Sequence, residues 1–510
     1  MEWEWMHDHM ETEQVLSARP VQVVVETEAA LPGGLREEAR IFHTDATVAM
    51  QGGEAAGGRV AASGHVTFHV LYSQGNLEQV RVLEAGADFS QSLPLKDDHA
   101  QQGAALVRPR GEVQHVSARV LGGRLHLQAV ISLSAEALLP RNLSFIRDVS
   151  AQGNVERAMQ TLSIQRAVGE GEGQALLREE FTLSDVLQIR ETLYATGSAR
   201  VEDILGGADG KVTVTGVIAL EAYHTADMPG RPLVYTRHSM PFEQSIYLTG
   251  SMGDALAARS EVRDVAVLSQ DGREDGEKIM RAEVQLHTEI TALQHQQLEA
   301  LRDVFTTSGD NVETSCQQVI YRTGMIRETA AESGKTVMEL PDGAPRVKTA
   351  LLGFARPVLT GAEKQGGRLG TEGILDSTLI YLTDDNPIPV TARQETPFRM
   401  AFTTQAGPED ALSLQALQVE PSPVTGDRVE MKYVLQLQGD GVRKDETAMI
   451  VDASPVSAPE GEKGISLCFL QKEEGLWDVA KRHRAPLQQV QALNPDWREG
   501  SGQPVIICRP

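Results

Sequence analysis

Residues 465–510 read ISLCFLQKEEGLWDVAKRHRAPLQQVQALNPDWREGSGQPVIICRP, and the rest of the chain can be understood by working outward from them. The first of these residues are apolar and partly β-branched, which predicts a short strand. Two helices are then predicted from apolar residues at helical spacing: Leu476, Val479 and Ala480 in the first, and Leu487, Val490 and Leu493 in the second. Pro486 suits the first turn of the second helix, and Asn494-Pro495 ends it. A final strand is predicted at residues 505–508, so the predicted order is strand, helix, helix, strand.

This layout resembles a LysM domain. The resembling residues are Leu476, Trp477, Asp478, Val479, Ala480, Lys481 and Arg482, then Asn494 and Pro495, then Gly502 and Gln503. The turn Gly-Asp-Thr that is usual in the family is replaced by Glu473-Glu474-Gly475, which counts against sugar binding. The resemblance implies a site that binds a protein partner or a glycan, formed by Glu473, Glu474, Gly475, Leu476, Trp477, Asp478, Lys481, Arg482, Asn494, Pro495 and Asp496. Leu476 and Trp477 are also expected in the core of this small domain.

The composition restricts the classes of partner. The 71 acidic and 47 basic residues give a net charge of −24, which would repel nucleic acid and anionic lipid. The first residues, MEWEWMHDHMETEQ, do not have the pattern of a signal peptide, and no apolar run is long enough for a membrane helix. Cys316, Cys468 and Cys508 are expected to be reduced thiols. These features predict a cytoplasmic protein.

The rest of the chain shows a repeat with a period of about 150 residues. A strand that begins with Gly and ends with Tyr occurs at residues 64–72, 216–223 and 373–381. The second marker is Pro-Phe at residues 241–242 and 397–398, of which the first copy keeps Phe89. The third is a hairpin, with Gly122-Gly123 as its turn in the first copy. The fourth is an aspartate that closes each copy: Asp148, Asp303 and Asp452.

The hairpin strands alternate apolar and polar residues, as at residues 281–290, which predicts antiparallel sheets with one buried face. The predicted fold is mainly β, with three tandem sandwich-like repeats and a small C-terminal domain. Short helices are expected at residues 156–163 and 294–306. The predicted boundaries are a flexible acidic N-terminus (1–12), repeats at 13–150, 151–306 and 307–453, a linker at 454–464, and the LysM-like domain at 465–510.

Three such units followed by a LysM-like domain resemble the SipL family, whose repeat is called the SPOCS domain. The resemblance covers nearly the whole chain. It implies a spore-coat morphogenetic protein that acts in the mother cell and helps the ATPase of the coat's basement layer encase the forespore. It also implies that the LysM-like domain contributes to that protein contact.

The sequence predicts no catalytic residues, metal site or cofactor. His65 and His69 lie four residues apart on a predicted strand, about 13 Å along it, which is too far to share a metal ion. We therefore expect a non-enzymatic scaffold whose partner is a protein. The alternative is a peptidoglycan-binding protein, in which the LysM-like domain holds N-acetylglucosamine glycan. A third reading, glycan hydrolysis, would need a catalytic domain that the sequence does not indicate.

Overall fold

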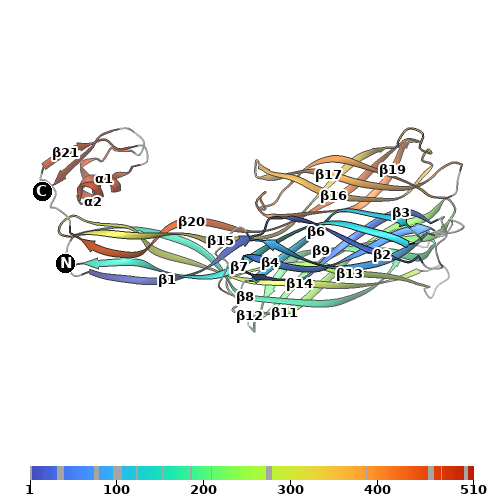
Figure 1. Cartoon of the computed structure of the whole chain (residues 1–510), viewed down its shortest axis with the longest axis horizontal. Coiled ribbons are helices and arrows are strands. Elements are labelled where there is room, and N and C mark those ends of the chain that lie inside the picture. The colour runs from blue at the N-terminus through green and yellow to red at the C-terminus, as the bar shows by residue number, and fades with distance from the viewer. Residues whose placement is uncertain are drawn as a thin grey trace.

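The computed structural model describes residues 3–31, 39–73, 80–95, 106–121, 124–151, 154–183, 187–207, 209–271, 278–385, 388–457, 464–471, 474–498 and 503–509. The prediction of a mainly β protein with antiparallel sheets is confirmed. Figure 1 shows strands β1 (Trp3–Ser17), β15 (Asn311–Glu339) and β20 (Arg428–Val456) running away from the packed sheets toward the N-terminus, with the C-terminal residues beside their ends. Within the described residues, neither helix has the length and apolar character needed to cross a membrane.

The first unit (residues 3–151) contains two sheets. In one, β7 lies between β1 and β2 and also pairs with β6; in the other, the order is β3-β4-β5. The strands are β1 (Trp3–Ser17), β2 (Val21–Ala29), β3 (Arg40–Ala56), β4 (Arg59–Ser73), β5 (Val80–Pro94), β6 (Leu106–Leu121) and β7 (Arg124–Ala151). β6 and β7 are antiparallel up to the pair Leu121 and Arg124, as the hairpin prediction requires. The predicted turn itself, Gly122-Gly123, lies outside the described residues.

The second unit (residues 155–306) has sheets of order β12-β8-β14-β13 and β11-β10-β9. Its strands are β8 (Val155–Leu183), β9 (Ile189–Gly206), β10 (Lys211–Met228), β11 (Arg231–Tyr247), β12 (Thr249–Gly250), β13 (Ala255–Asp271) and β14 (Lys278–Thr306).

The third unit (residues 311–456) has sheets of order β15-β20-β19 and β16-β17-β18. Its strands are β15 (Asn311–Glu339), β16 (Thr349–Gln365), β17 (Arg368–Leu382), β18 (Val390–Phe402), β19 (Ala411–Thr425) and β20 (Arg428–Val456).

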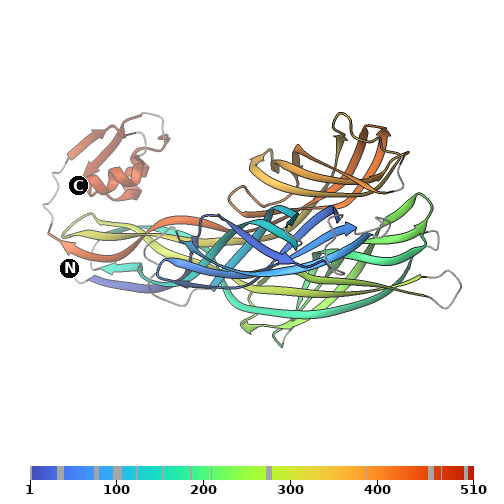
Figure 2. The same cartoon turned by 45° about the vertical axis from the view of Figure 1, so that its right-hand side comes forward.

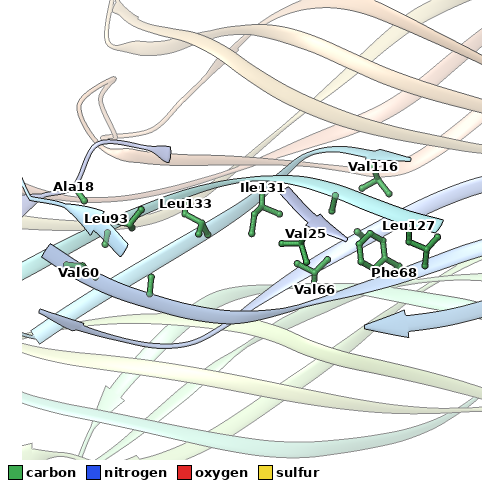
Figure 3. Close-up of a cluster of buried hydrophobic side chains, with 14 of the residues drawn as sticks. Ala18, Val25, Val60, Val66, Phe68, Leu93, Val116, Leu127, Ile131 and Leu133 are labelled. Carbon is green, nitrogen blue, oxygen red and sulfur yellow. The ribbon is translucent and has the colours of Figure 1, made fainter. Parts of the chain in front are cut away.

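In each unit the two sheets share one hydrophobic core. In the first unit, Val25 and Ile131 of one sheet meet Val66 and Phe68 of the other (Figure 3). The alternation seen in the sequence explains this packing, because apolar residues at every second position all point to the same face. Residues 282, 284, 286 and 290 of β14 are accordingly buried.

The glycine and phenylalanine markers are opposite each other in the sheets. Gly64 pairs with Phe89, Gly216 with Phe242, and Gly373 with Phe398. A Cβ atom at these glycines would lie 2.6, 2.7 and 2.8 Å, respectively, from the phenylalanine ring. The ring therefore occupies the space that any larger residue would need, which explains why the two markers occur together. The three tyrosines Tyr72, Tyr223 and Tyr381 each lie on the central strand of their sheet.

The aspartate markers lie at β-bulges. The register of β7 shifts at Arg147, that of β14 at Arg302 and that of β20 at Val451, each one residue before the aspartate. In all three places the carboxylate accepts a hydrogen bond from the next backbone N–H, at 2.8 to 2.9 Å. An extra residue in one strand needs a partner for its displaced backbone groups, and the aspartate provides it.

The strand ends beyond these cores form three ribbons, β1 with β7, β8 with β14, and β15 with β20, which pack on one another. Their shared core contains Met10, Phe145, Leu162, Ile164, Leu298, Ala300, Val319, Tyr321 and Met449. A second cluster lies at the bulges and contains Ile146, Val149, Leu301, Val304, Val312 and Ile450. We call the end of each ribbon nearest its bulge the tip of that unit.

Three predictions about local structure are wrong. Residues 3–12 are not flexible but belong to β1, because Met10 is buried in the ribbon core and the rings of Trp3 and Trp5 stack. Residues 156–163 and 294–306 are strands rather than helices. A spacing of four residues, as between Ala158 and Leu162, fits one face of a helix or of a strand equally well. In β14 the bulge at Arg302 changes the phase of the alternation, which places Leu301 and Val304 three residues apart.

The C-terminal unit, called the tail (residues 464–509), has the predicted element order. It contains β21 (Gly464–Cys468), α1 (Leu476–His483), α2 (Leu487–Leu493) and β22 (Val505–Arg509), and β21 pairs with β22 antiparallel. Of the predicted linker, residues 454–456 belong to β20, and residues 458–463 lie outside the described part of the chain.

Candidate functional site

The tail packs against the tip of the second unit, because Phe305 of that unit belongs to the buried cluster of the tail. Figure 2 shows the tail on the side of the molecule where the N-terminus lies. Asp303, at the bulge of β14, accepts hydrogen bonds from Trp477 Nε1 at 2.8 Å and from Lys481 Nζ at 2.6 Å. Trp477 and Lys481 are four residues apart on α1, so both side chains project from the same side of the helix. One carboxylate thus holds one face of α1.

Phe305 completes this contact from the side of the second unit. Its side chain is 0% exposed and belongs to the same buried cluster as Val479, Val490 and Ile507 of the tail. Its ring lies edge-on to that of Trp477, with 5.0 Å between the centroids. The hydrophobic core of the tail therefore includes a residue of the second unit, so the two units share buried apolar surface.

A second set of hydrogen bonds surrounds the connection between the two helices. Arg484, at the C-cap of α1, has the left-handed backbone conformation with φ of 51°. Its guanidinium donates to the carbonyl and the hydroxyl oxygen of Thr306, at 3.0 and 2.8 Å. The backbone N–H of Leu487 donates to the Glu156 carboxylate at 3.3 Å. We call the whole contact, centred on Asp303, Phe305 and Thr306, the seat.

The other two tips differ from the second at the residues that form the seat. The positions equivalent to Phe305, two residues after the aspartate, are Ser150 and Ser454, and both are exposed. Asp148 is bound instead by Arg157 of the neighbouring ribbon, at 3.0 Å. Arg157 pairs with Val304 in the sheet, and the corresponding position in the third unit is Thr314, which pairs with Ala453. Asp148 therefore has an arginine beside it on the next ribbon, whereas Asp303 has Thr314 in the corresponding place. The positive charge that pairs with Asp303 comes from Lys481 instead.

The structure separates the predicted binding residues into groups. Trp477 and Lys481 lie at the seat and face the second unit. Arg482 and Glu474 pair with each other. Gly475 and Asp478 form the capping contact of α1, in which the Gly475 N–H donates to the Asp478 carboxylate at 2.8 Å. Leu476 is half-buried beside the core of the tail, whereas Glu473 lies outside the described residues.

Asn494 has a structural role. Its side-chain amide donates to the carbonyl oxygens of Val490 and Ile506, and its side-chain oxygen accepts from the Ile506 N–H, each at 2.7 Å. These bonds join the end of α2 to β22. Pro495 and Asp496 beside it are exposed. Within the predicted binding site, Glu474 and Arg482 are thus tied up in an ion pair, and Asn494 belongs to a fixed turn that is followed by the exposed Asp496.

The tail also has an exposed apolar face, which the sequence reasoning did not identify. Ile465 and Leu467 of β21 and Phe469 just after it are 77%, 65% and 73% exposed. Ile506 lies opposite Leu467 on the same outer side, while Val505 and Ile507 face the helices. We call Ile465, Leu467, Phe469 and Ile506 the outer ribbon face. The sequence contained a signal for this face. Cys468 and Leu470 form the inward row that packs on the core of the tail, so the apolar residues that alternate with them, from Ile465 to Phe469, must point outward.

The three cysteines have free thiols. Cys468 Sγ lies 2.9 Å from His483 Nε2, so the thiol interacts with α1. Cys468 is opposite Val505 in the sheet, and Cys508 is opposite Ile465. Among the residues that the structure describes, no group of three His, Cys, Asp or Glu side chains is arranged to hold a metal ion.

Comparisons with known protein families, curated proteins and solved structures gave no match for this chain.

Proposed function

We propose that the chain is a non-enzymatic scaffold that recruits a protein partner through its tail. The resemblance to the SipL family makes the partner the ATPase of the spore-coat basement layer, and the place of action the mother-cell side of the forespore. The observation that carries the proposal is the outer ribbon face, which presents large apolar side chains to solvent. Contiguous exposed apolar surface of this kind is characteristic of protein-binding sites.

We further propose that the three units are SPOCS-like repeats and that the tail is a LysM domain. The matching sheet orders, the paired glycine and phenylalanine residues, and the bulge before each aspartate support the first part. The strand, helix, helix, strand order of the tail supports the second.

The geometry changes which residues of the tail we assign to the partner. From the sequence, Lys481 and Arg482 were expected among the residues that bind the partner. Lys481 is bound to Asp303, and Arg482 is paired with Glu474, so neither charge is available without breaking an existing contact. We therefore assign the protein contact to the outer ribbon face. An apolar surface of the ATPase would be its counterpart.

The proposal is tested by co-purification of the coat ATPase with the full-length protein from sporulating cells. Leu467→Asp should reduce recovery of the ATPase strongly, because it places a charge in the centre of an apolar contact. Leu268→Asp is a matched control, since Leu268 is also an exposed leucine on a strand, in the second unit. A protein that ends at Gly464 should fail to recover the ATPase.

Recovery of the ATPase by the truncated protein at the full level would contradict the proposal. A parallel experiment with immobilised muropeptides tests the alternative, peptidoglycan binding. Retention of the full-length protein there, together with unchanged ATPase recovery by Leu467→Asp, would favour the glycan function.

A further inference from the structure

A large cavity lies where the three units meet, away from the tail. Its volume is about 2290 Å³, and strands of all three units line it. Each unit contributes an arginine: Arg110 from β6, Arg259 from β13 and Arg327 from β15. Pockets for small ligands typically have volumes of about 300–1,000 Å³, so this space is large enough for a ligand and water.

The three guanidinium groups converge on one oxygen atom. Asp440 Oδ2 lies 2.9 Å from Arg110 Nη2, 3.8 Å from Arg259 Nη1 and 3.9 Å from Arg327 Nε. The two longer distances exceed the range of a hydrogen bond. One carboxylate therefore provides charge for three arginines but cannot accept from all of their N–H groups.

Arg327 has donors without partners. Its side chain is only 4% exposed, and within the described residues its Nε and Nη1 atoms have no hydrogen-bond acceptor. Arg110 Nη2 likewise lacks a well-aligned acceptor there. A buried guanidinium that keeps its charge needs acceptors, because an unmet charged donor costs more free energy than a neutral one. Both arginines line the cavity, although these donor atoms are themselves buried, so a small movement of the side chains would let a ligand in the cavity supply the missing acceptors.

Other carboxylates pair with these arginines only at longer range. Glu289 lies 3.8 Å from Arg327 Nη2, and Glu136 lies 3.8 Å from Arg110 Nη2. The Glu289 side chain is 44% exposed, against 4% for Arg327, so this acid lies nearer to solvent than the guanidinium. A hydrogen bond from His287 and the neighbouring arginines lower the pKa of Glu289 to about 2, so it is ionised at neutral pH. The guanidinium of Arg327 is thus more deeply buried than the ionised Glu289 beside it.

We propose that this cavity binds a small multivalent oxyanion of the phosphate class, held by Arg110, Arg259 and Arg327. Guanidinium groups recognise such anions through paired N–H donors, and three of them from three directions match the several oxygens of a phosphate. The bound anion accepts the hydrogen bonds that Asp440 cannot, and it links all three units at their junction.

The test is isothermal titration of the full-length protein with inorganic phosphate, at ionic strength held constant with sodium chloride. We expect saturable binding of one phosphate per chain. Arg327→Gln should weaken it by about tenfold or more, the size expected for a lost hydrogen bond to a charged group. Asp440→Asn should tighten it, because the competing carboxylate charge is removed. Arg399→Gln is the control, since Arg399 is 83% exposed and pairs with Glu372 on the surface.

Circular dichroism establishes that each variant is folded. If Arg327→Gln does not fold, Arg259→Gln carries the same test, because Arg259 is more exposed and contacts Asp440 only at long range. The absence of saturable phosphate binding would overturn the proposal, and water would then fill the cavity. Weaker binding by Asp440→Asn would also overturn it, since Asp440 would then help to hold the ligand.

Discussion

The tips of the first and second units have the same bulge and the same aspartate, yet they have different partners. Asp148 binds Arg157 of the neighbouring ribbon, whereas Asp303 binds Trp477 and Lys481 of the tail. The difference lies in two positions: Phe305 replaces Ser150, and Thr314 replaces Arg157 in the corresponding place. The aspartate stabilises the bulge in every unit, but only in the second unit does it also bind the tail, because the residues around it there are different.

The comparison also explains why the tail has one fixed position in the structure. The aspartate alone would not distinguish the three tips, since all three bulges use it. The buried ring of Phe305 adds apolar area that Ser150 and Ser454 do not offer. Burial of apolar surface gives affinity, and the hydrogen bonds to Asp303 give orientation.

The largest expected effect comes from making the second tip like the first. Phe305→Ser should weaken the seat by about 3–5 kcal/mol, the usual cost of truncating a buried phenylalanine. Hydrogen–deuterium exchange of the α1 amides should become faster, because the tail loses part of its core. The control is Ser150→Phe, which should leave exchange of α1 unchanged. Unchanged exchange in Phe305→Ser would mean that the tail does not depend on this ring.

The second prediction concerns the sheets of the second unit, away from the seat, and the way their stability depends on pH. His224 is fully buried, and its ring nitrogens lie 2.7 Å from Thr236 Oγ1 and 3.1 Å from Thr192 Oγ1. Burial lowers its pKa to about 4 from the usual 6.5, so the folded protein keeps this histidine neutral while the unfolded chain takes up a proton. The free energy of unfolding should therefore be highest above pH 6.5 and fall by about 3 kcal/mol as the pH drops to 4.

Urea unfolding measured across this pH range tests the prediction. His224→Gln can keep both contacts with the threonine hydroxyls but has no proton to gain, so its stability should depend less on pH. An equal pH dependence in the variant and the parent would show that other groups cause the loss.

The third prediction compares the two aspartates directly. Asp303→Asn should weaken the seat by about 1–3 kcal/mol, because it removes the charge that Lys481 and Trp477 share. Asp148→Asn should cost less, about 0–1 kcal/mol, since its pair with Arg157 is partly exposed. The measurement is the change in unfolding free energy of each variant together with the exchange rate of α1. Faster exchange of α1 in Asp148→Asn would contradict the assignment of the seat to the second tip.

The smallest effect is expected from giving Asp303 a partner within the body. Thr314→Arg places an arginine where Arg157 stands beside Asp148, and it should compete with Lys481 for the carboxylate. We expect a modest increase in α1 exchange, well below that of Phe305→Ser, because the apolar part of the seat remains. Thr314→Lys should act in the same direction, and Thr314→Val should have no effect. An arginine variant that behaves like the valine variant would show that the carboxylate is not shared in this way.

Local patterns in the sequence predicted the sheets well. The alternation at residues 281–290 defined a buried face, and the glycine and phenylalanine markers lie opposite each other. The same patterns misled where a bulge changed the phase, as at Arg302, or where acidic residues concealed an alternation, as around Met10. The seat could not be predicted, because Asp303 and Lys481 are far apart in the sequence and no local pattern links them. The outer ribbon face could have been predicted, since all four residues from Leu467 to Leu470 are apolar and a strand with this sequence must expose one of its two rows.

The central claim is that the tail is held on the second tip through Asp303 and Lys481, which leaves its outer ribbon face free. A zero-length carbodiimide cross-linker joins a lysine to a carboxylate only when the two are in direct contact, as Lys481 Nζ and Asp303 Oδ1 are at 2.6 Å. Mass spectrometry of the cross-linked full-length protein should identify a Lys481–Asp303 bond within one chain, and Phe305→Ser should reduce its yield. Cross-linking of Lys481 to Asp148 or Asp452 in place of Asp303 would contradict the account.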